Sequence, residues 1–367
     1  MADFRMPSLG ADMEAGTVTR WLVAPGDRVA RGDVVAVVDT DKADVDVEIF
    51  QDGVIDRILV PEGQKVPVGT PLASVRGGHD TDAAPPTSTP PAAPHDTLSP
   101  VIRRLARHLD VALDDVIGSG PGGTITRADI EAAARAAPTP PEKPPDRDAA
   151  MRDAIGRLMA RSKREIPHYY LSAESDFSEA RAWLNGANAE RPVAERILPA
   201  ALLLKAVALA THDVERMNGF FVDDRFETAN AVNVGVAIAL REGGLVAPAI
   251  HDVDHKDLDR LMQDLRDLVG RARSGRLRSS EMSDPTITVT NLGDQGVDSV
   301  FGVIYPPQVA LVGFGTVVER PLVVDGEVRA RPTVRMTLAA DHRVSDGHSG
   351  ARLLRRIDAH LQDPGAL

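Results

Sequence analysis

The pattern of apolar and polar positions divides the chain into three segments of different character. Residues 1–76 contain short β-branched runs separated by Pro-Gly, Glu-Gly and Arg-Gly turns, a pattern typical of short strands. Residues 97–133 place Val101, Leu105 and Leu109 on one helical stripe. Residues 149–367 alternate helical and strand patterns, which predicts an α/β or α+β domain.

The third segment has the clearest periodicity. Its expected strands are residues 232–240, 286–291, 309–315 and 334–340. Between the first two of these strands, one amphipathic stretch predicts a helix. The apolar face of that helix consists of Leu258, Leu261, Met262, Leu265, Leu268 and Val269.

Two stretches rich in Ala and Pro, Gly77 to Asp96 and Ala134 to Asp148, separate the segments. They contain almost no large apolar residues, and runs of Pro favour an extended, semi-rigid chain, so both are expected to be linkers. The predicted organisation is therefore three domains and two linkers. The domains are residues 1–76, 97–133 and 149–367, and the linkers are residues 77–96 and 134–148.

The first segment contains an internal repeat. Gly16 to Val38 aligns with Gly53 to Val75 without a gap, which predicts two equivalent halves of a small, pseudo-symmetric all-β sandwich. The connection between the halves places Lys42 at or near a turn. Taken alone, an exposed turn lysine is usually a solvated charge.

The repeat and its lysine together resemble the lipoyl domain over essentially all of residues 1–76. This resemblance implies that lipoate is amidated to Nζ of Lys42. A biotin carrier has a related fold, but its lysine lies between methionines, whereas Asp41 and Ala43 flank Lys42. The segment has 8 basic and 13 acidic residues, and its negative field is suited to docking on basic partner surfaces.

The second segment predicts a small all-α module. A helix is expected to start at Ser99 and Pro100, and Thr126 followed by Asp129 is expected to cap a second helix. The glycine-rich stretch between them, residues 118–123, has neither the Gly-Lys-Ser/Thr sequence nor the preceding strand of a phosphate-binding loop.

Over its whole length this segment resembles the peripheral subunit-binding domain of 2-oxo-acid dehydrogenase complexes. Arg103 and Arg104 match the basic pair that such domains present to an acidic partner. The simpler interpretation is that both arginines only solvate an ordinary helix. The family commonly has a further Arg where this chain has Thr124, which leaves the choice of partner open.

Composition and charge exclude several classes of function. The chain has 42 Lys plus Arg against 54 Asp plus Glu, a net charge of −12, which disfavours non-specific binding to nucleic acid. It has no Cys, so disulfides, thiolate metal sites and a cysteine nucleophile are excluded. The longest apolar run, residues 200–210, is interrupted by Lys205 and is too short to span a membrane. With no recognisable leader sequence, a cytoplasmic location is expected.

The candidate chemistry follows the last expected strand, in the sequence DHRVSDG at residues 341–347. Imidazole titrates near neutral pH, so His342 with Asp346 four residues later is the minimum set for general-base catalysis. A lone His near an Asp is more often structural. The motif by itself therefore leaves both interpretations open.

The motif resembles the Asp-His-Arg-x-x-Asp-Gly signature of the dihydrolipoyl acyltransferase components of 2-oxo-acid dehydrogenase complexes, and more distantly that of chloramphenicol acetyltransferase. Residues 166–170, 232–237, 290–293 and 306–308 also match the family, and all three segments follow its domain order. The resemblance implies an α/β, chloramphenicol-acetyltransferase-like catalytic domain.

The implied reaction is transfer of an acyl group from the lipoyl dithiol to coenzyme A. By resemblance, His342 removes the proton of the coenzyme A thiol, and Thr290 donates its hydroxyl to the tetrahedral oxyanion. Asp346 is expected to hold the active-site loop and Arg343 in place. Because both reacting sulfurs come from lipoate and coenzyme A, direct transfer without an acyl-enzyme is expected.

The resemblance also implies partners: a 2-oxo-acid decarboxylase, a dihydrolipoyl dehydrogenase and further copies of this chain. The family's active site lies between subunits of a trimer, so a homotrimer is expected, with larger assemblies left open. His348 stands where the family usually has a small residue.

Several alternatives stay open at this point. A non-catalytic scaffold with the same domains would dock partners and carry acyl groups, but it would not need the retained His342, Asp346 and Thr290. A biotinyl carrier is opposed by the residues that flank Lys42. The acyl group does not follow from the sequence, although acetyl or a short branched group is favoured. No metal is expected, because in the stretch from His251 to His255 a helix-capping role for Asp254 fits better than a metal site.

Overall fold

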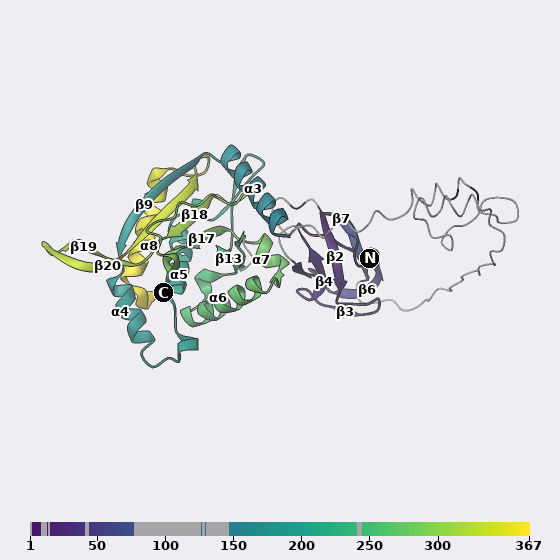
Figure 1. The fold of residues 1–367 in the computed structure, drawn as a ribbon, viewed down its shortest axis with the longest axis horizontal. Helices are drawn as coiled ribbons and strands as arrows, with labels where there is room; N and C mark the ends of the chain where they lie inside the picture. The colour runs from purple at the N-terminus through teal and green to yellow at the C-terminus, as the bar shows by residue number, and fades with distance from the viewer. Residues whose placement is uncertain are drawn as a thin grey trace. The chain divides into compact units, whose positions relative to one another are not determined.

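The computed structural model describes residues 2–8, 13, 15–40, 44–76, 126, 129, 147–240 and 244–367. Lys42, Arg103, Arg104 and Thr124 lie outside these residues. Figure 1 shows the chain coloured from the N-terminus to the C-terminus.

The N-terminal part is a sandwich of two antiparallel sheets, as predicted (Figure 1). One sheet has the order β1-β8-β6-β3, and the other contains β5-β4-β2-β7 in that order. Apolar side chains from both sheets, among them Val18, Val38 and Leu72, are fully buried between them. The strands are β1 (Ala2–Arg5), β2 (Ala15–Trp21), β3 (Arg28–Val29), β4 (Val34–Asp39), β5 (Asp44–Glu48), β6 (Gly53–Ile58), β7 (Lys65–Pro67) and β8 (Pro71–Arg76).

The predicted internal repeat is confirmed by matching contacts in the two halves. Gly26 N donates to Ile55 O, and the equivalent Gly63 N donates to Val18 O, both at 2.7 Å. Both glycines have positive φ, at 101° and 83°, which a residue with a Cβ adopts only with strain. The two halves therefore form the same turns for the same steric reason.

The expected lipoyl lysine belongs to the connection between β4 and β5. These strands pair antiparallel, with Asp39 opposite Asp44. Only four residues connect the two paired positions, and Lys42 is one of them.

In the second segment the structure describes Thr126 and Asp129. Asp129 Oδ2 accepts from Thr126 N at 2.8 Å and from Thr126 Oγ1 at 2.9 Å, and Asp129 N donates to Thr126 Oγ1 at 3.4 Å. This reciprocal arrangement confirms the predicted cap, and residue 129 is helical.

The C-terminal part is built on a seven-stranded mixed sheet, ordered β15-β12-β17-β18-β20-β19, with β9 also paired to β20. The sheet strands are β9 (His168–Asp176), β12 (Val234–Val236), β15 (Ala249–Ile250), β17 (Ile287–Asn291), β18 (Ala310–Phe314), β19 (Val318–Val324) and β20 (Glu327–Asp341). Shorter strands are β10 (Gly219–Val222), β11 (Arg225–Thr228), β13 (Ile238–Ala239), β14 (Leu245–Val246) and β16 (Leu277–Arg278). The helices are α3 (Arg147–Glu165), α4 (Ser178–Ala187), α5 (Pro199–Asp213), α6 (Leu258–Arg273), α7 (Ser279–Ser283) and α8 (Gly347–Gln362).

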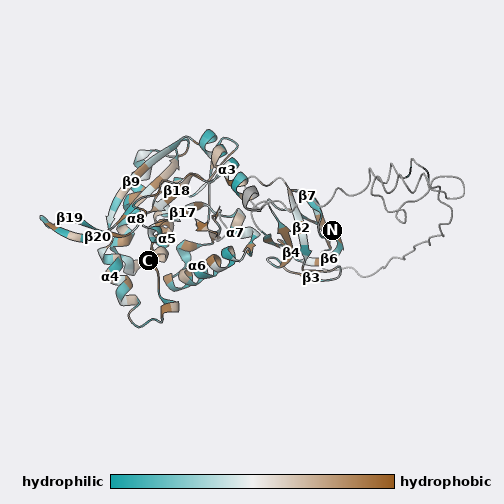
Figure 2. Cartoon of the chain, viewed as in Figure 1, coloured by the Kyte–Doolittle hydropathy of each residue, from teal (hydrophilic) through white to brown (hydrophobic). Residues whose placement is uncertain are grey.

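The helices pack against this sheet in one main core. Helices α4, α5, α6 and α8 bury their apolar sides in one core with alternate residues of the strands, such as Val289 and Val312. Figure 2 shows hydrophobic residues concentrated where α5, β17 and β18 meet, and hydrophilic residues along much of α3. A separate, smaller buried cluster contains Ile166, Ile304 and Leu311.

The fold largely agrees with the sequence, except at the start of α6. The four expected strand regions contain β12 with β13, β17, β18 and the last half of β20, and α6 buries most of the apolar stripe predicted for it. However, Asp254 does not cap α6. Asp257 is the N-cap, and its carboxylate accepts from Arg260 N at 2.7 Å, while Asp254 lies in a preceding 3-10 turn.

Candidate active site

His342 lies on a turn directly after β20. Its backbone N donates to Pro167 O at 3.0 Å, which ties the turn to the start of β9, where His168 pairs with Asp341. The amides of Val344 and Ser345 donate to Asp341 O at 3.1 and 3.0 Å, closing the turn. The side chain of His342 is exposed, so a substrate can reach it.

The ring of Tyr169 contacts the imidazole of His342. The two rings meet edge to face, with centroids 5.2 Å apart and planes at 66°. The Tyr169 hydroxyl lies 2.9 Å from Ser345 Oγ. Burial raises the pKa of Tyr169, so this hydroxyl keeps its proton at neutral pH.

Arg343 is held by Asp341, not by Asp346. The guanidinium donates to both carboxylate oxygens of Asp341, with Nη2 2.6 Å from Oδ2, and the Asp341 side chain is fully buried. Arg343 also lies over the ring of Phe221, with Cζ 3.9 Å from the ring centroid. The expectation that Asp346 holds Arg343 is therefore wrong.

Asp346 instead begins α8. Its Oδ1 accepts from Ser349 N at 2.9 Å, which is an N-cap interaction, and this hydrogen bond lowers the pKa of Asp346. Because Asp346 follows the His342 turn directly, the cap fixes where the turn ends and the helix starts.

Thr290 lies at a different position on the sheet from His342. It is half-buried near the end of β17, opposite Gly313 of β18, and Gly313 is opposite Thr337 of β20. His342 comes five positions after Thr337. At about 3.4 Å per step, these five steps span about 17 Å along the sheet, before the two strand spacings are added. One chain therefore does not bring Thr290 and His342 together.

Thr290 belongs to the sheet face opposite the main helices. Side chains alternate along a strand, and Ile287 and Val289 face the helical core, so Thr288 and Thr290 face the other way. Thr288 Oγ1 donates to Gln308 Oε1 at 2.7 Å.

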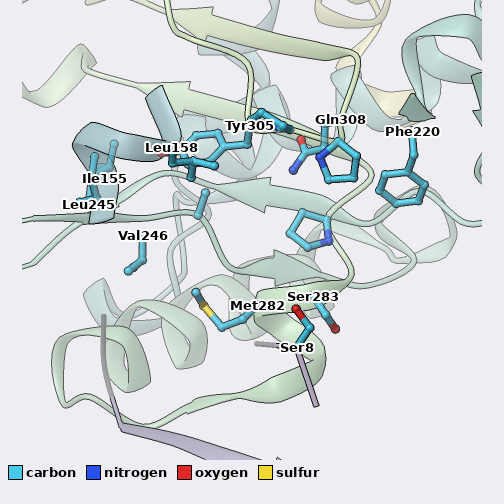
Figure 3. A pocket seen from close by; sticks show the side chains of 14 residues that line it. Ser8, Ile155, Leu158, Phe220, Leu245, Val246, Met282, Ser283, Tyr305 and Gln308 are labelled. Carbon is cyan, nitrogen blue, oxygen red and sulfur yellow. The ribbon is translucent and has the colours of Figure 1, made fainter. Parts of the chain in front are cut away.

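Gln308 also lines a pocket of about 310 Å³ (Figure 3). Apolar side chains from α3, β10, β14 and α7 form most of its wall, together with Tyr305 and the two prolines that follow it. None of the described side chains that line it is charged. Burial raises the pKa of Tyr305 to about 12, so its hydroxyl is neutral.

His168, which pairs with Asp341 at the start of β9, has a structural role. Its Nδ1 lies 2.8 Å from Ile166 O, and its Nε2 accepts from Ile304 N at 3.1 Å. A carbonyl only accepts, so Nδ1 carries the proton and the ring is neutral. Burial lowers the pKa of His168 in agreement with this assignment.

The histidines near Asp254 do not form a metal site. His212 Nε2 and His255 Nε2 lie 2.9 and 3.4 Å from the same oxygen of Asp254. In the part of the chain that the structure describes, no group of three or more His, Cys, Asp or Glu side chains is arranged to hold a metal ion. Likewise, no helix in this part is long and apolar enough to cross a membrane.

Comparison with known proteins identifies the family of the chain. The family model described as 2-oxoacid dehydrogenases acyltransferase (catalytic domain) matches residues 147–367, a biotin-requiring enzyme model matches residues 2–75, and an e3 binding domain model matches residues 97–131. The chain belongs to the 2-oxoacid dehydrogenase acyltransferase family.

Relatives in this family align along almost the whole chain. The lipoamide acyltransferase component of the branched-chain alpha-keto acid dehydrogenase complex of Bacillus subtilis is 31% identical, over 97% of this chain and 96% of its own. Acetyltransferase component 3 of the mitochondrial pyruvate dehydrogenase complex of Arabidopsis thaliana is also 31% identical, over 99% of this chain and 78% of its own. The dihydrolipoamide acetyltransferase of Azotobacter vinelandii has a solved structure with TM-score 0.56 and 25% identity, covering 62% of this chain and 99% of that one.

The sequence singled out His342, Thr290 and Asp346, but it missed the residues that surround the histidine. Tyr169 lies inside the block 166–170 that matches the family, and its contact with His342 depends on the pairing of β9 with β20. Asp341 is the acidic neighbour two residues before Arg343. The sequence does not show that the Asp341 side chain is fully buried, and this burial is what identifies it as the partner of Arg343.

Proposed function

We propose that His342 is the general base in this acyltransferase, which transfers an acyl group from the S-acyl-dihydrolipoyl arm to coenzyme A in a 2-oxo-acid dehydrogenase complex. The observation that carries the proposal is the exposed imidazole, fixed at the end of β20 by its own backbone and by Tyr169. Partner docking through the subunit-binding segment belongs to the same function.

His342 takes the proton of the coenzyme A thiol, and the thiolate attacks the thioester carbonyl carbon. The tetrahedral oxyanion then collapses, and the bond from this carbon to the dihydrolipoyl sulfur breaks. That sulfur receives the proton from the imidazolium, which leaves acyl-coenzyme A and a free dithiol. The chain has no Cys and does not need one, because both sulfurs belong to the substrates.

Thr290 donates its hydroxyl to the oxyanion, a contribution of about 3 to 4 kcal/mol for donors of this kind. Because Thr290 and His342 lie far apart along the sheet, the two residues that meet in one site come from two copies of the chain. A closed ring such as a trimer repeats this contact once per subunit.

The spacing of the residues supports these assignments. In the dihydrolipoamide acetyltransferase of Azotobacter vinelandii, the role of a serine, a histidine and an asparagine in the catalytic mechanism was investigated. There the histidine follows the serine by 52 residues and precedes the asparagine by four, and the same intervals separate His342 from Thr290 and Asp346 here. Asn and Asp both cap helices, which agrees with a positioning role for Asp346.

Lipoate is the covalent cofactor of the N-terminal domain, and when bound it supplies the thiol that carries the acyl group. Its attachment to Lys42 is supported by the short connection between the paired ends of β4 and β5. Arg103 and Arg104 remain the proposed contacts to an acidic partner. The partners are a 2-oxo-acid decarboxylase and a dihydrolipoyl dehydrogenase.

An uncharged acyl group, acetyl or short branched, is the proposed cargo. The pocket beside Gln308 is apolar (Figure 3). Gln308 accepts from Thr288, which faces the same side of the sheet as Thr290. A succinyl carboxylate would be buried in this pocket without a cation, which is costly. A cytoplasmic location stays a prediction of the sequence.

The test is acyl transfer to coenzyme A from S-acetyl-, S-isobutyryl- and S-succinyl-dihydrolipoamide. We expect turnover with the first two donors and a fall in kcat of about 100-fold or more in His342→Ala. His348→Ala is the matched control, because this exposed histidine is six residues away and has no assigned role. A folded, oligomeric wild type that transfers none of the three groups would support the non-catalytic scaffold instead.

Lys42→Arg separates the two functions of the chain. Transfer from free acyl-dihydrolipoamides should remain at the wild-type rate, while overall turnover with the decarboxylase is lost. If overall turnover survives, or if mass spectrometry shows biotin on Lys42, the lipoyl assignment is wrong.

A further inference from the structure

We propose that Tyr169 is a positioning residue, which fixes the imidazole of His342 in the orientation that proton transfer requires. This inference rests on the proposed function, in which His342 is the base. Tyr169 touches the imidazole edge to face and has no assigned role in the reaction itself.

Hydrogen bonds link Tyr169 to the turn that carries His342. The Tyr169 hydroxyl and Ser345 Oγ share a hydrogen bond of 2.9 Å, in which either oxygen can be the donor. Ser345 Oγ also lies 3.4 Å from Asp341 O, which only accepts. Through Ser345 the Tyr169 hydroxyl is linked to the carbonyl that begins the turn carrying His342.

Tyr169 is itself held rigidly. It pairs with Ala340 in the ladder between β9 and β20, and its ring packs against the core under α8. Gly350 of α8 leaves the space for its hydroxyl, because a Cβ at that position would lie 3.0 Å from the Tyr169 oxygen and 2.8 Å from Leu171 Cδ1. The ring thus has a defined place on the side of the sheet that the helices cover.

The consequence for His342 is a restricted ring orientation. An exposed imidazole on a turn samples several side-chain rotamers, and only those that aim the basic nitrogen at the thiol are productive. One face of the site is closed by the Tyr169 ring, which removes some of the unproductive rotamers. Loss of the ring should therefore lower kcat and leave the KM for coenzyme A unchanged.

The test compares Tyr169→Leu with Tyr169→Phe and with Tyr170→Leu. Removing the ring should lower kcat by about 30- to 100-fold, the scale of a small misplacement of a catalytic group, with KM for coenzyme A within about twofold. Phenylalanine keeps the ring and should restore kcat to within about fivefold of wild type, since it lacks one hydrogen bond. Tyr170→Leu is the matched control. Tyr170 is the next residue of the strand and stacks on His168, with centroids 5.8 Å apart, so its loss should leave kcat unchanged.

Ser345→Ala provides a second measurement if Tyr169→Leu does not fold. It leaves the half-buried Tyr169 hydroxyl without its hydrogen-bond partner, whereas Tyr169→Phe removes the hydroxyl and its need for a partner together. Ser345→Ala should therefore reduce kcat more than Tyr169→Phe does. If Ser345→Ala and Tyr169→Phe both keep the wild-type kcat, the positioning role is wrong.

A readout independent of activity is the NMR spectrum of the full chain, labelled with carbon-13 at histidine Cε1. The His342 signal, assigned by its loss in His342→Ala, should shift and broaden in Tyr169→Leu and stay in place in Tyr170→Leu, where the His168 signal moves instead. An unchanged His342 signal in Tyr169→Leu would overturn the inference. Failure of the proposed function is distinguishable, because it would appear as a wild type no more active than His342→Ala.

Discussion

Thr290 lies about 17 Å along the sheet from His342, a separation that follows from the residue pairing and the rise of about 3.4 Å per residue. Both residues are ordered in strands or in a turn closed by hydrogen bonds, so a local rearrangement does not bring them together. The proposed site, which needs both residues, is therefore one that two copies of the chain form together, whereas the stability of each domain can be tested on residues of one chain.

Gly313→Ala should destabilise the C-terminal domain. A Cβ at this position would overlap Val300 O and lie 2.5 Å from Thr337 Oγ1, so the segment that covers this face of the sheet would have to move. We expect a loss of about 1 to 3 kcal/mol in the free energy of unfolding, measured by chemical denaturation. Gly156→Ala is the control. It lies inside α3 with nothing within 4 Å and should raise stability by about 0.5 to 1 kcal/mol. Equal effects of the two substitutions would contradict this account.

Asp346→Asn should retain most of the activity, whereas Asp346→Ala should not. Asparagine caps a helix about as well as aspartate, and alanine loses about 1 kcal/mol of cap energy at the start of α8. The readouts are kcat and thermal unfolding for both variants. A large loss of kcat in Asp346→Asn with unchanged stability would instead assign Asp346 a role in proton transfer.

The pair of His251 and Asp284 should make stability depend on pH. The hydrogen bond that His251 Nε2 donates to Asp284 Oδ2, 3.1 Å away, raises the pKa of His251, whereas burial opposes this shift. Burial also works to raise the pKa of Asp284, but hydrogen bonds from His251 and Ser283 outweigh it, and that pKa is lowered.

The sign of each contribution follows from these directions. A raised histidine pKa stabilises the fold below the unfolded value of 6.5, and this stabilisation is lost as pH rises through the folded value. A lowered aspartate pKa stabilises above the unfolded value of 3.8 and is lost as pH falls through the folded value. The difference in unfolding free energy between wild type and His251→Gln should therefore be larger at pH 5.5 than at pH 8.5. A difference that does not change with pH would show that the pair is not charged in the folded protein.

The sequence predicts the elements whose cause is local. The repeat of the N-terminal domain depends on turns that need glycine, and Gly26 and Gly63 have the same hydrogen bonds and positive φ in both halves. The sequence around His342 was equally visible, because its residues are consecutive in the chain. These features need no knowledge of which strands lie side by side.

Features that depend on pairing between distant strands were not predictable in the same way. The start of β20, from Glu327 to Ala330, is exposed at every position, so no buried face marks it as a strand of the core, and the expected strand began only at residue 334. Its partner β19 supplies the hydrogen bonds instead. Likewise, the contact of Tyr169 with His342 and the separation of Thr290 from His342 follow from the sheet register.

The most direct test of the two-copy active site mixes two inactive variants. His342→Ala and Thr290→Ala are each expected to be nearly inactive, and their subunits are unfolded together in equal amounts and refolded into mixed oligomers. If each site takes His342 from one copy and Thr290 from its neighbour, about one quarter of the sites in a random cyclic assembly contain both intact residues. Acyl transfer should then recover to about a quarter of the wild-type rate. Mixed oligomers that form and yet show no more activity than the separate variants would contradict the account and place both residues of each site in one chain.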